Sequence, residues 1–69
     1  MKLSARNQLS GTILEVSPGA VTTTVKVQLG GGDVVTASIT KEAADDLGLA
    51  VGNAVTVVVK ASDVILAVE

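Results

Sequence analysis

The segment over residues 21–29 shows the clearest alternation of apolar and polar side chains in this sequence. Its odd-numbered positions carry Val, Thr, Val, Val and Leu, and its even-numbered positions carry Thr, Thr, Lys and Gln. Successive side chains of a β-strand point to opposite faces of a sheet, and β-branched residues are favoured in strands. The pattern therefore predicts a strand with one buried face.

Four further segments have the character of strands. Residues 9–16 alternate imperfectly, and residues 34–39 are rich in β-branched side chains. Residues 54–60 contain a continuous run of Val, which favours burial on both faces of the strand. Residues 64–68 form a last apolar stretch, so the sequence predicts five strands in total.

Turn residues separate most of these segments. Pro fixes φ near −65°, and Gly accepts positive φ, so both mark places where the chain reverses. Such residues occur as Ser-Pro-Gly at 17–19, Gly-Gly-Gly-Asp at 30–33 and Gly-Asn at 52–53. The glycines at 30–32 predict a hairpin, since no Lys-Ser or Lys-Thr pair follows them as a phosphate-binding loop would require.

One segment, residues 41–47, has the character of a helix. Thr40 precedes it as a candidate N-cap, Glu42 lies in its first turn, and Gly48 follows it at the position that favours left-handed backbone. The order of elements is then three strands, one helix and two strands. This order predicts a five-stranded OB-like barrel with the helix between strands three and four, and an SH3-like barrel is the alternative. We expect residues 1–69 to form a single domain.

The composition excludes several classes of protein. The chain contains no His, Cys, Phe, Tyr or Trp. Thiolate metal sites, disulfides, Ser–His and Cys nucleophile systems and aromatic stacking platforms for RNA are therefore absent. The net charge of −2 and the sequence pI near 4.8 argue against a nucleic-acid or membrane-surface binder. Without an export signal or a long apolar run, the default expectation is a cytoplasmic protein.

The apolar fraction points to assembly. Apolar residues make up 48% of the chain, which is high for so small a body. Chains of this length rarely gain enough stability from one core and usually need a further constraint. We therefore predict a homo-oligomer that buries part of this apolar surface between its subunits.

The sequence offers little for catalysis. Without His, the remaining acid–base candidates are carboxylates, and the only close pair is Asp45 and Asp46. Adjacent residues on a helix point about 100° apart, so this pair is interpreted as a solvated helix face. We expect no enzymatic activity and no metal site with direct protein ligands.

Two segments are unusually rich in hydrogen-bond donors. Residues 4–8 read Ser-Ala-Arg-Asn-Gln just before the first predicted strand, and residues 60–62 read Lys-Ala-Ser at the end of the fourth. An oxyanion offers only acceptor oxygens, so its binding site must be built from donors. From the residues alone, each segment is either part of such a site or an ordinary solvated strand end.

A resemblance favours the first interpretation. The segments SARNQ at 4–8, ASIT at 37–40, LGL at 47–49 with Gly52, and KASDV at 60–64 resemble the molbindin (Mop) family of small molybdate-binding proteins. The same unit recurs as the TOBE/Mop domain of molybdate-responsive regulators and transport ATPases. The resemblance spans essentially the whole chain and fits the single-unit members of the family.

The resemblance implies an OB-like barrel that assembles as a hexamer, a trimer of dimers, with molybdate or tungstate held between subunits by hydrogen bonds. It implies intracellular molybdenum storage, buffering or delivery in the cytoplasm, with no other cofactor and with neither nucleic acid nor membrane as a partner. The implied oxyanion-binding residues are Ser4, Arg6, Asn7, Thr40, Lys60, Ala61 (through its backbone N–H) and Ser62. A possible second oxyanion site is implied at Gly19, Ala20 and Val21. The alternatives are an OB-fold nucleic-acid-binding module and a purely structural oligomerisation module without a ligand.

Overall fold

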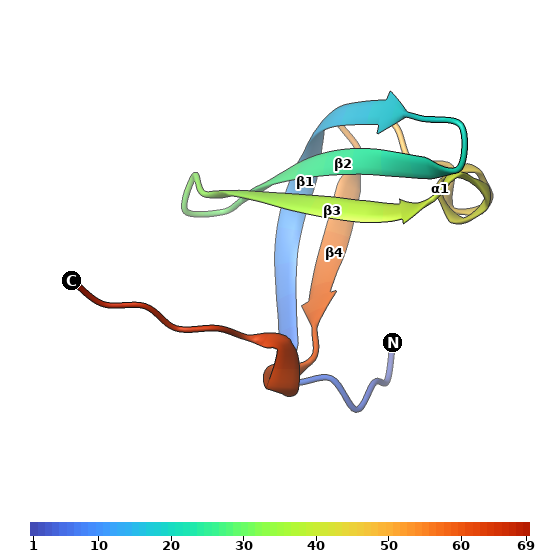
Figure 1. The fold of residues 1–69 in the computed structure, drawn as a ribbon. Coiled ribbons are helices and arrows are strands. Elements are labelled where there is room, and N and C mark those ends of the chain that lie inside the picture. The colour runs from blue at the N-terminus through green and yellow to red at the C-terminus, as the bar shows by residue number, and fades with distance from the viewer.

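The computed structural model describes all residues 1–69 and contains one antiparallel sheet that curls into a half-barrel (Figure 1). The strands lie in the order β3-β2-β1-β4. The elements are β1 (Asn7–Pro18), β2 (Thr22–Leu29), β3 (Val34–Thr40), α1 (Lys41–Leu47), β4 (Ala54–Val59) and the 3₁₀ turn η1 (Ala61–Asp63). The all-β class with one short helix is confirmed. No helix of the chain has the length and apolar character needed to cross a membrane.

Strand β1 is long because it serves both halves of the sheet. Its first half pairs with β4 from Asn7 to Thr12, and its second half pairs with β2 from Gly11 to Pro18. The strand bends where the two halves meet. A Cβ atom on Gly11 would lie 2.5 Å from Cγ1 of Val27, so only glycine fits at this bend without a shift of its neighbours.

A β-bulge between Ile13 and Glu15 changes which side chains face inward. Simple alternation would place Glu15 on the same face as Ile13. The extra residue, Leu14, instead brings Val16 against the core and leaves Glu15 exposed. The core consists of the buried side chains of Ile13, Val25 and Val27, with half-buried aliphatic side chains packed around them.

The hairpin and the helix are confirmed as the sequence predicts them. Thr40 caps α1, since its Oγ1 accepts the N–H of Ala43 at 3.1 Å. Gly48 ends the helix with a left-handed φ of 62°. Only Ala44 of α1 is buried, so the helix covers one end of the half-barrel through a small contact.

Two predictions about the C-terminal part are wrong for the single chain. Residues 64–68 form no strand, because no segment of the chain lies in position to pair with them. Strand β4 ends at Val59 and is not buried on both faces: its residues alternate between half-buried and exposed. The structure therefore has four strands, and the curled sheet stays open between its two edge strands, β3 and β4.

Candidate functional site

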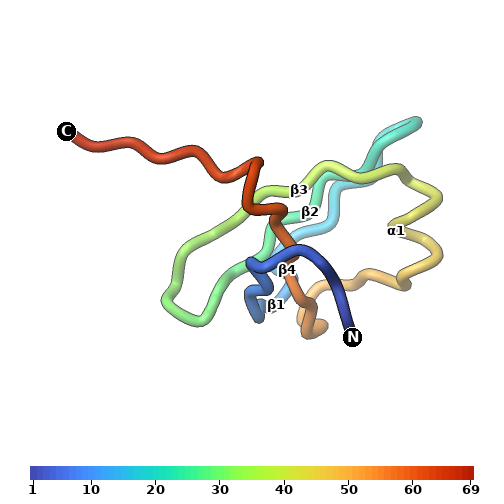
Figure 2. The backbone as a smooth tube through the Cα atoms, turned by 90° about the horizontal axis from the view of Figure 1, so that it is seen from below, coloured from blue at the N-terminus to red at the C-terminus, as the bar shows by residue number.

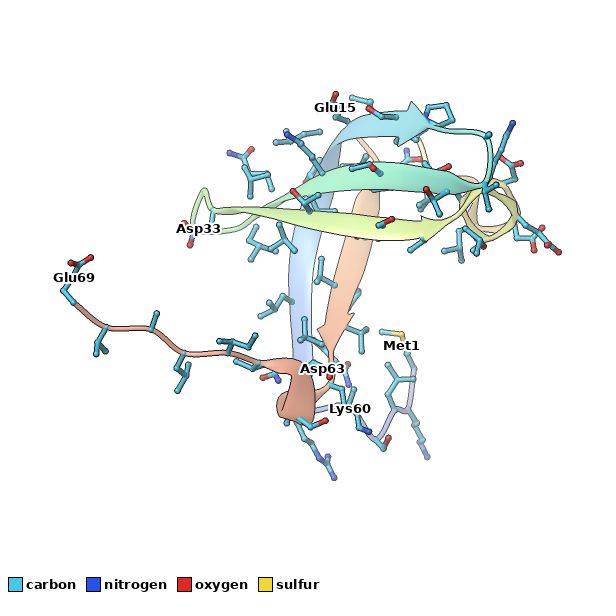
Figure 3. All side chains as sticks on the ribbon, viewed as in Figure 1. Met1, Glu15, Asp33, Lys60, Asp63 and Glu69 are labelled. Atoms are coloured by element: carbon cyan, nitrogen blue, oxygen red, sulfur yellow. The ribbon has the colours of Figure 1, made fainter.

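The pairing of β1 with β4 brings the two donor-rich segments to the same end of the sheet. Asn7, the first residue of β1, pairs with Val59, the last residue of β4. The Asn7 side chain strengthens this junction, since its Nδ2 donates to the carbonyl oxygen of Val59 at 3.1 Å. Residues before Asn7 and after Val59 therefore leave the sheet together, and Figure 3 shows Lys60 and Asp63 at this end. We call this donor-rich group the strand-end cluster; its members are Ser4, Arg6, Asn7, Lys60, Ala61 and Ser62.

The backbone after β4 leaves two donors free. The N–H of Asp63 donates to the Lys60 carbonyl at 2.9 Å, and the N–H of Val64 donates to the Ala61 carbonyl at 3.3 Å. The N–H groups of Ala61 and Ser62 come first in this 3₁₀ turn and donate to no carbonyl of the chain. Two adjacent backbone donors are thus available to an acceptor from outside.

Apart from half-buried Asn7, the side chains of the strand-end cluster are exposed and form no hydrogen bond. Ser4, Arg6, Lys60 and Ser62 take part in none of the side-chain hydrogen bonds of the chain. Gln8 holds the segment that leads into β1, since its Nε2 donates to the carbonyl oxygen of Ala5 at 3.2 Å. Two cationic groups and two hydroxyls therefore stand at one end of the sheet without an acceptor.

Thr40 lies elsewhere. It ends β3, and β3 and β4 are the opposite edges of the sheet. Its Oγ1 already accepts a hydrogen bond as the cap of α1, which leaves the hydroxyl hydrogen as its remaining donor. A single chain therefore does not bring Thr40 into the strand-end cluster.

The residues of the possible second site form the turn between β1 and β2, next to Thr40. Thr22 pairs with Thr40 across the sheet, and the carbonyl of Val21 accepts the N–H of Lys41 at 2.9 Å. The N–H of Gly19 is already used, since it donates to the Thr22 carbonyl at 2.8 Å. Only the N–H groups of Ala20 and Val21 are free in this turn. We call the second group, Gly19, Ala20, Val21 and Thr40, the turn cluster.

Two hollows were not anticipated from the sequence. An apolar groove of about 190 Å³ lies between β3 and β4, and Val25, Val27, Ile39, Leu49, Val55 and Val57 are among its lining residues. A polar hollow of about 270 Å³ lies over the bend of β1 and the end of β2, next to Ser10, Thr12 and Gln28. Alternation marks which side chains face inward, but it does not show where a sheet fails to close.

The chain is a small, mainly β domain whose exposed strand ends carry hydrogen-bond donors. The sequence matches the TOBE domain family over residues 3–66. The chain belongs to this family and, within it, to the Mop-type proteins, as the motifs of the sequence indicate.

Three similar proteins illustrate the relationship. Molybdenum-pterin-binding protein 3 of Clostridium pasteurianum is 42% identical over 66 residues, which cover 96% of this chain and 97% of that protein. The molybdenum transport protein ModE of Herbaspirillum seropedicae is 51% identical over 67 residues, and the chain spans only 25% of its length. The crystal structure of the cytoplasmic molybdate-binding protein ModG with molybdate bound has a TM-score of 0.90 and 46% identity, covering 94% of this chain and 46% of ModG.

Proposed function

We propose that this protein binds molybdate, without catalysing a reaction, at sites between the subunits of a homo-oligomer. The observation that carries the proposal is the strand-end cluster, where two cationic side chains, two hydroxyls and two free backbone N–H groups belong to segments that leave the sheet at the same end. Relatives named for molybdenum-pterin binding and the molybdate-bound ModG structure support molybdate as the ligand. The protein would serve in intracellular molybdenum storage, buffering or delivery in the cytoplasm.

The chemistry of the cluster fits a tetrahedral dianion. Its four oxygens accept hydrogen bonds only, so a site needs several donors and gains nothing from carboxylates. Arg6 and Lys60 would supply charge-assisted bonds, which are roughly twice as strong as neutral ones. Ser4, Ser62 and the N–H groups of Ala61 and Ser62 would fix the orientation of the anion, and Asn7 would hold the two segments together. Tungstate has the same shape and charge and would bind in the same way.

The division of the donors between two places favours a site shared by copies. The strand-end cluster and Thr40 belong to opposite edges of the sheet, so one chain cannot offer both to the same anion. A second copy would supply the Thr40 that the strand-end cluster of the first copy lacks. The turn cluster would form a second type of site through the N–H groups of Ala20 and Val21, with Gly19 shaping the turn. We propose a hexamer built as a trimer of dimers, in which each 69-residue chain is one oxyanion-binding domain.

The five-stranded OB-like form of the barrel belongs to the same proposal. The chain alone provides four strands, and its two edge strands face each other across an apolar groove. The closed barrel therefore requires a further strand that does not come from the four-stranded sheet.

Isothermal titration of molybdate into the protein, in buffer without phosphate or sulfate, tests the proposal. We expect saturable binding at a ratio near or above one anion per chain. Loss of one hydrogen bond to a charged group costs about 1.5–3 kcal/mol, so Arg6→Ala or Ser62→Ala is expected to weaken binding about 10- to 150-fold.

Lys26→Ala and Thr36→Ala are the matched controls. Both residues are exposed and pair with each other in the middle of β2 and β3, away from either cluster, so neither substitution should change the molybdate affinity. Equal affinities for all four variants would contradict the assigned site. The absence of any heat at millimolar molybdate would contradict the function itself.

A further inference from the structure

We propose that Asp63 makes the strand-end cluster selective for ligand charge: its carboxylate lowers the affinity for a dianion and so keeps bound molybdate exchangeable. The inference rests on the proposed function, because it concerns an anion held by the free N–H groups of Ala61 and Ser62. The members of the cluster favour an anion, whereas Asp63 beside them opposes it.

Asp63 is the only carboxylate in the two arms of the chain that build this end of the sheet. Residues 1–14 contain none, and residues 54–68 contain Asp63 alone. The cations of the same two arms are Lys2, Arg6 and Lys60. Figures 1 and 2 both show the N-terminal segment and η1 at this end, and Figure 3 shows Asp63 and Lys60 there. A single negative charge therefore lies within the donor-rich end of the molecule.

The turn η1 sets Asp63 close to the free donors. Asp63 is the last residue of this turn and directly follows Ser62. Its own N–H donates to the Lys60 carbonyl at 2.9 Å, which closes the turn. A 3₁₀ turn rises only about 2.0 Å per residue, so its three residues span about 6 Å. An anion bound at the start of the turn would therefore lie within about one Debye length of the Asp63 carboxylate, which is about 10 Å at 0.1 M salt.

The fold does not explain the charge at this position. The Asp63 side chain is exposed and takes part in none of the side-chain hydrogen bonds of the chain. A carboxylate at the third position of a helical turn can accept from the N–H groups at the start of the turn, and Asp63 accepts from none of them. Backbone hydrogen bonds alone hold η1. The charge is therefore free to act on an anion bound there.

The repulsion depends on the charge of the ligand. By Coulomb's law, the carboxylate repels a dianion twice as strongly as a monoanion of the same shape at the same place. Molybdate and perrhenate are both tetrahedral oxyanions, and molybdate is a dianion whereas perrhenate is a monoanion. This pair of ligands therefore separates the effect of charge from the effect of shape.

A charge that opposes binding suits a protein that has to release its ligand. Arg6 and Lys60 would hold the anion by charge-assisted bonds, which are the strong ones. Asp63 would offset part of that attraction. Most affinity differences among variants of one site appear in the dissociation rate, so the carboxylate would shorten the time for which molybdate stays bound.

Isothermal titration of the native chain and of Asp63→Asn tests the proposal, with molybdate and perrhenate as separate ligands in buffer of low ionic strength. Asn keeps the size of the side chain and removes its charge. We expect Asp63→Asn to bind molybdate about 3- to 10-fold more tightly. The gain for perrhenate should be only the square root of that factor. The gain for molybdate should shrink at 1 M salt, where the Debye length is about 3 Å.

Two variants serve as matched controls. Asp63→Glu retains the charge and should bind both anions as the native chain does. Asp33→Asn makes the same change of net charge at the hairpin between β2 and β3, which Figure 3 shows away from this end of the sheet. It should leave both affinities unchanged. Circular dichroism confirms that each variant is folded.

Several results would overturn the proposal. Weaker molybdate binding in Asp63→Asn would show that the carboxylate supports the site, and an unchanged affinity would show that it has no effect. Equal gains for both anions, or a gain that persists in full at 1 M salt, would indicate a change of shape rather than of charge.

The native chain distinguishes this failure from that of the proposed function. If it binds no molybdate, the proposed function is wrong, and the role of Asp63 is wrong with it. If it binds molybdate and Asp63→Asn binds no more tightly, only the role of Asp63 is wrong.

Discussion

The two halves of this chain differ sharply in how far each is buried within one copy. All five buried residues lie between Ile13 and Ala44, in the part that contains the β1–β2–β3 meander and α1. From residue 45 to the C-terminus no residue is buried, although this part contains the continuous Val run and the apolar C-terminal segment. The first part forms a core from its own side chains. The second part has comparable apolar character but stays at the margin of that core: Leu49, Val55 and Val57 pack against it while only half-buried, and residues 64–68 pair with no strand.

Apolar character alone therefore does not identify the core of a chain. In β2, local alternation and pairing on both sides place Val25 and Val27 inside. In residues 64–68, the same kind of side chain stays in water because no strand lies beside it. The difference is one of pairing partners, and for the second part the proposed partner is another copy.

The largest effect is expected in the first part. Ile13→Ala removes the bulkiest fully buried side chain of the core and should lower the free energy of unfolding by about 2–5 kcal/mol. Urea denaturation measures this change, and the loss should appear at every protein concentration. A loss below 0.5 kcal/mol would show that the core is not centred on this residue.

The second prediction concerns the other part. Leu66→Ala removes a side chain that is exposed in one copy and covered in the proposed assembly, so it should cost about 1.5–3 kcal/mol per chain. Because the loss falls on association, the melting temperature should depend more strongly on protein concentration than in the native chain. Val51→Ala, at another exposed apolar position, serves as the control. An unchanged melting temperature for Leu66→Ala would mean that the segment stays in water.

A smaller effect is expected at Thr40, the N-cap of α1, which is the helix that contains the boundary between the two parts. Thr40→Ala removes the side-chain cap of α1 and should cost about 1 kcal/mol, whereas Thr40→Ser should retain the cap. Thermal unfolding followed by circular dichroism measures both variants. If the Ser variant keeps the stability and the molybdate affinity while the Ala variant loses both, Thr40 acts in the helix and in the anion site. Equal stability of the two variants would exclude the capping role.

The smallest effect is a gain in stability. The Oγ1 atom of Thr23 is buried without a hydrogen-bond partner, and the residue is 1% exposed. Replacement by Val keeps the shape and removes the unsatisfied hydroxyl, so Thr23→Val should stabilise the fold by up to about 1 kcal/mol. Thr22→Val, on the exposed face of the same strand, should change the stability by less than about 0.5 kcal/mol. A loss of stability in Thr23→Val would indicate that the hydroxyl has a partner in the assembly.

Local signals explain what the sequence predicts well. Thr40 and Gly48 act on backbone groups within a few residues, so they fix the ends of α1 without regard to the rest of the fold. The hairpin between β2 and β3 follows for the same reason from the glycines and the alternation around them. The bulge at Leu14 has no such local signature, and it alone decides that Val16 rather than Glu15 faces the core.

In the candidate site, too, some features follow from the sequence and others depend on the whole fold. That Ser4, Arg6 and Lys60 lie at one end of the sheet follows from the pairing of β1 with β4. The separation of Thr40 from this cluster depends on which strands form the sheet edges. Alternation of apolar and polar residues does not show which strands lie at the edges of a sheet. For the same reason it does not predict the groove between β3 and β4.

Native mass spectrometry of the protein with molybdate tests whether the anion binds between subunits, because it reports assembly and anion binding in the same spectrum. Binding confined to the oligomer would stabilise the assembly by about 2.7 kcal/mol per site at a ligand concentration one hundred times Kd. We expect molybdate on the oligomer, no molybdate on the monomer, and a rising oligomer fraction as molybdate is added. Molybdate bound to the monomer with the oligomer's affinity would contradict this expectation.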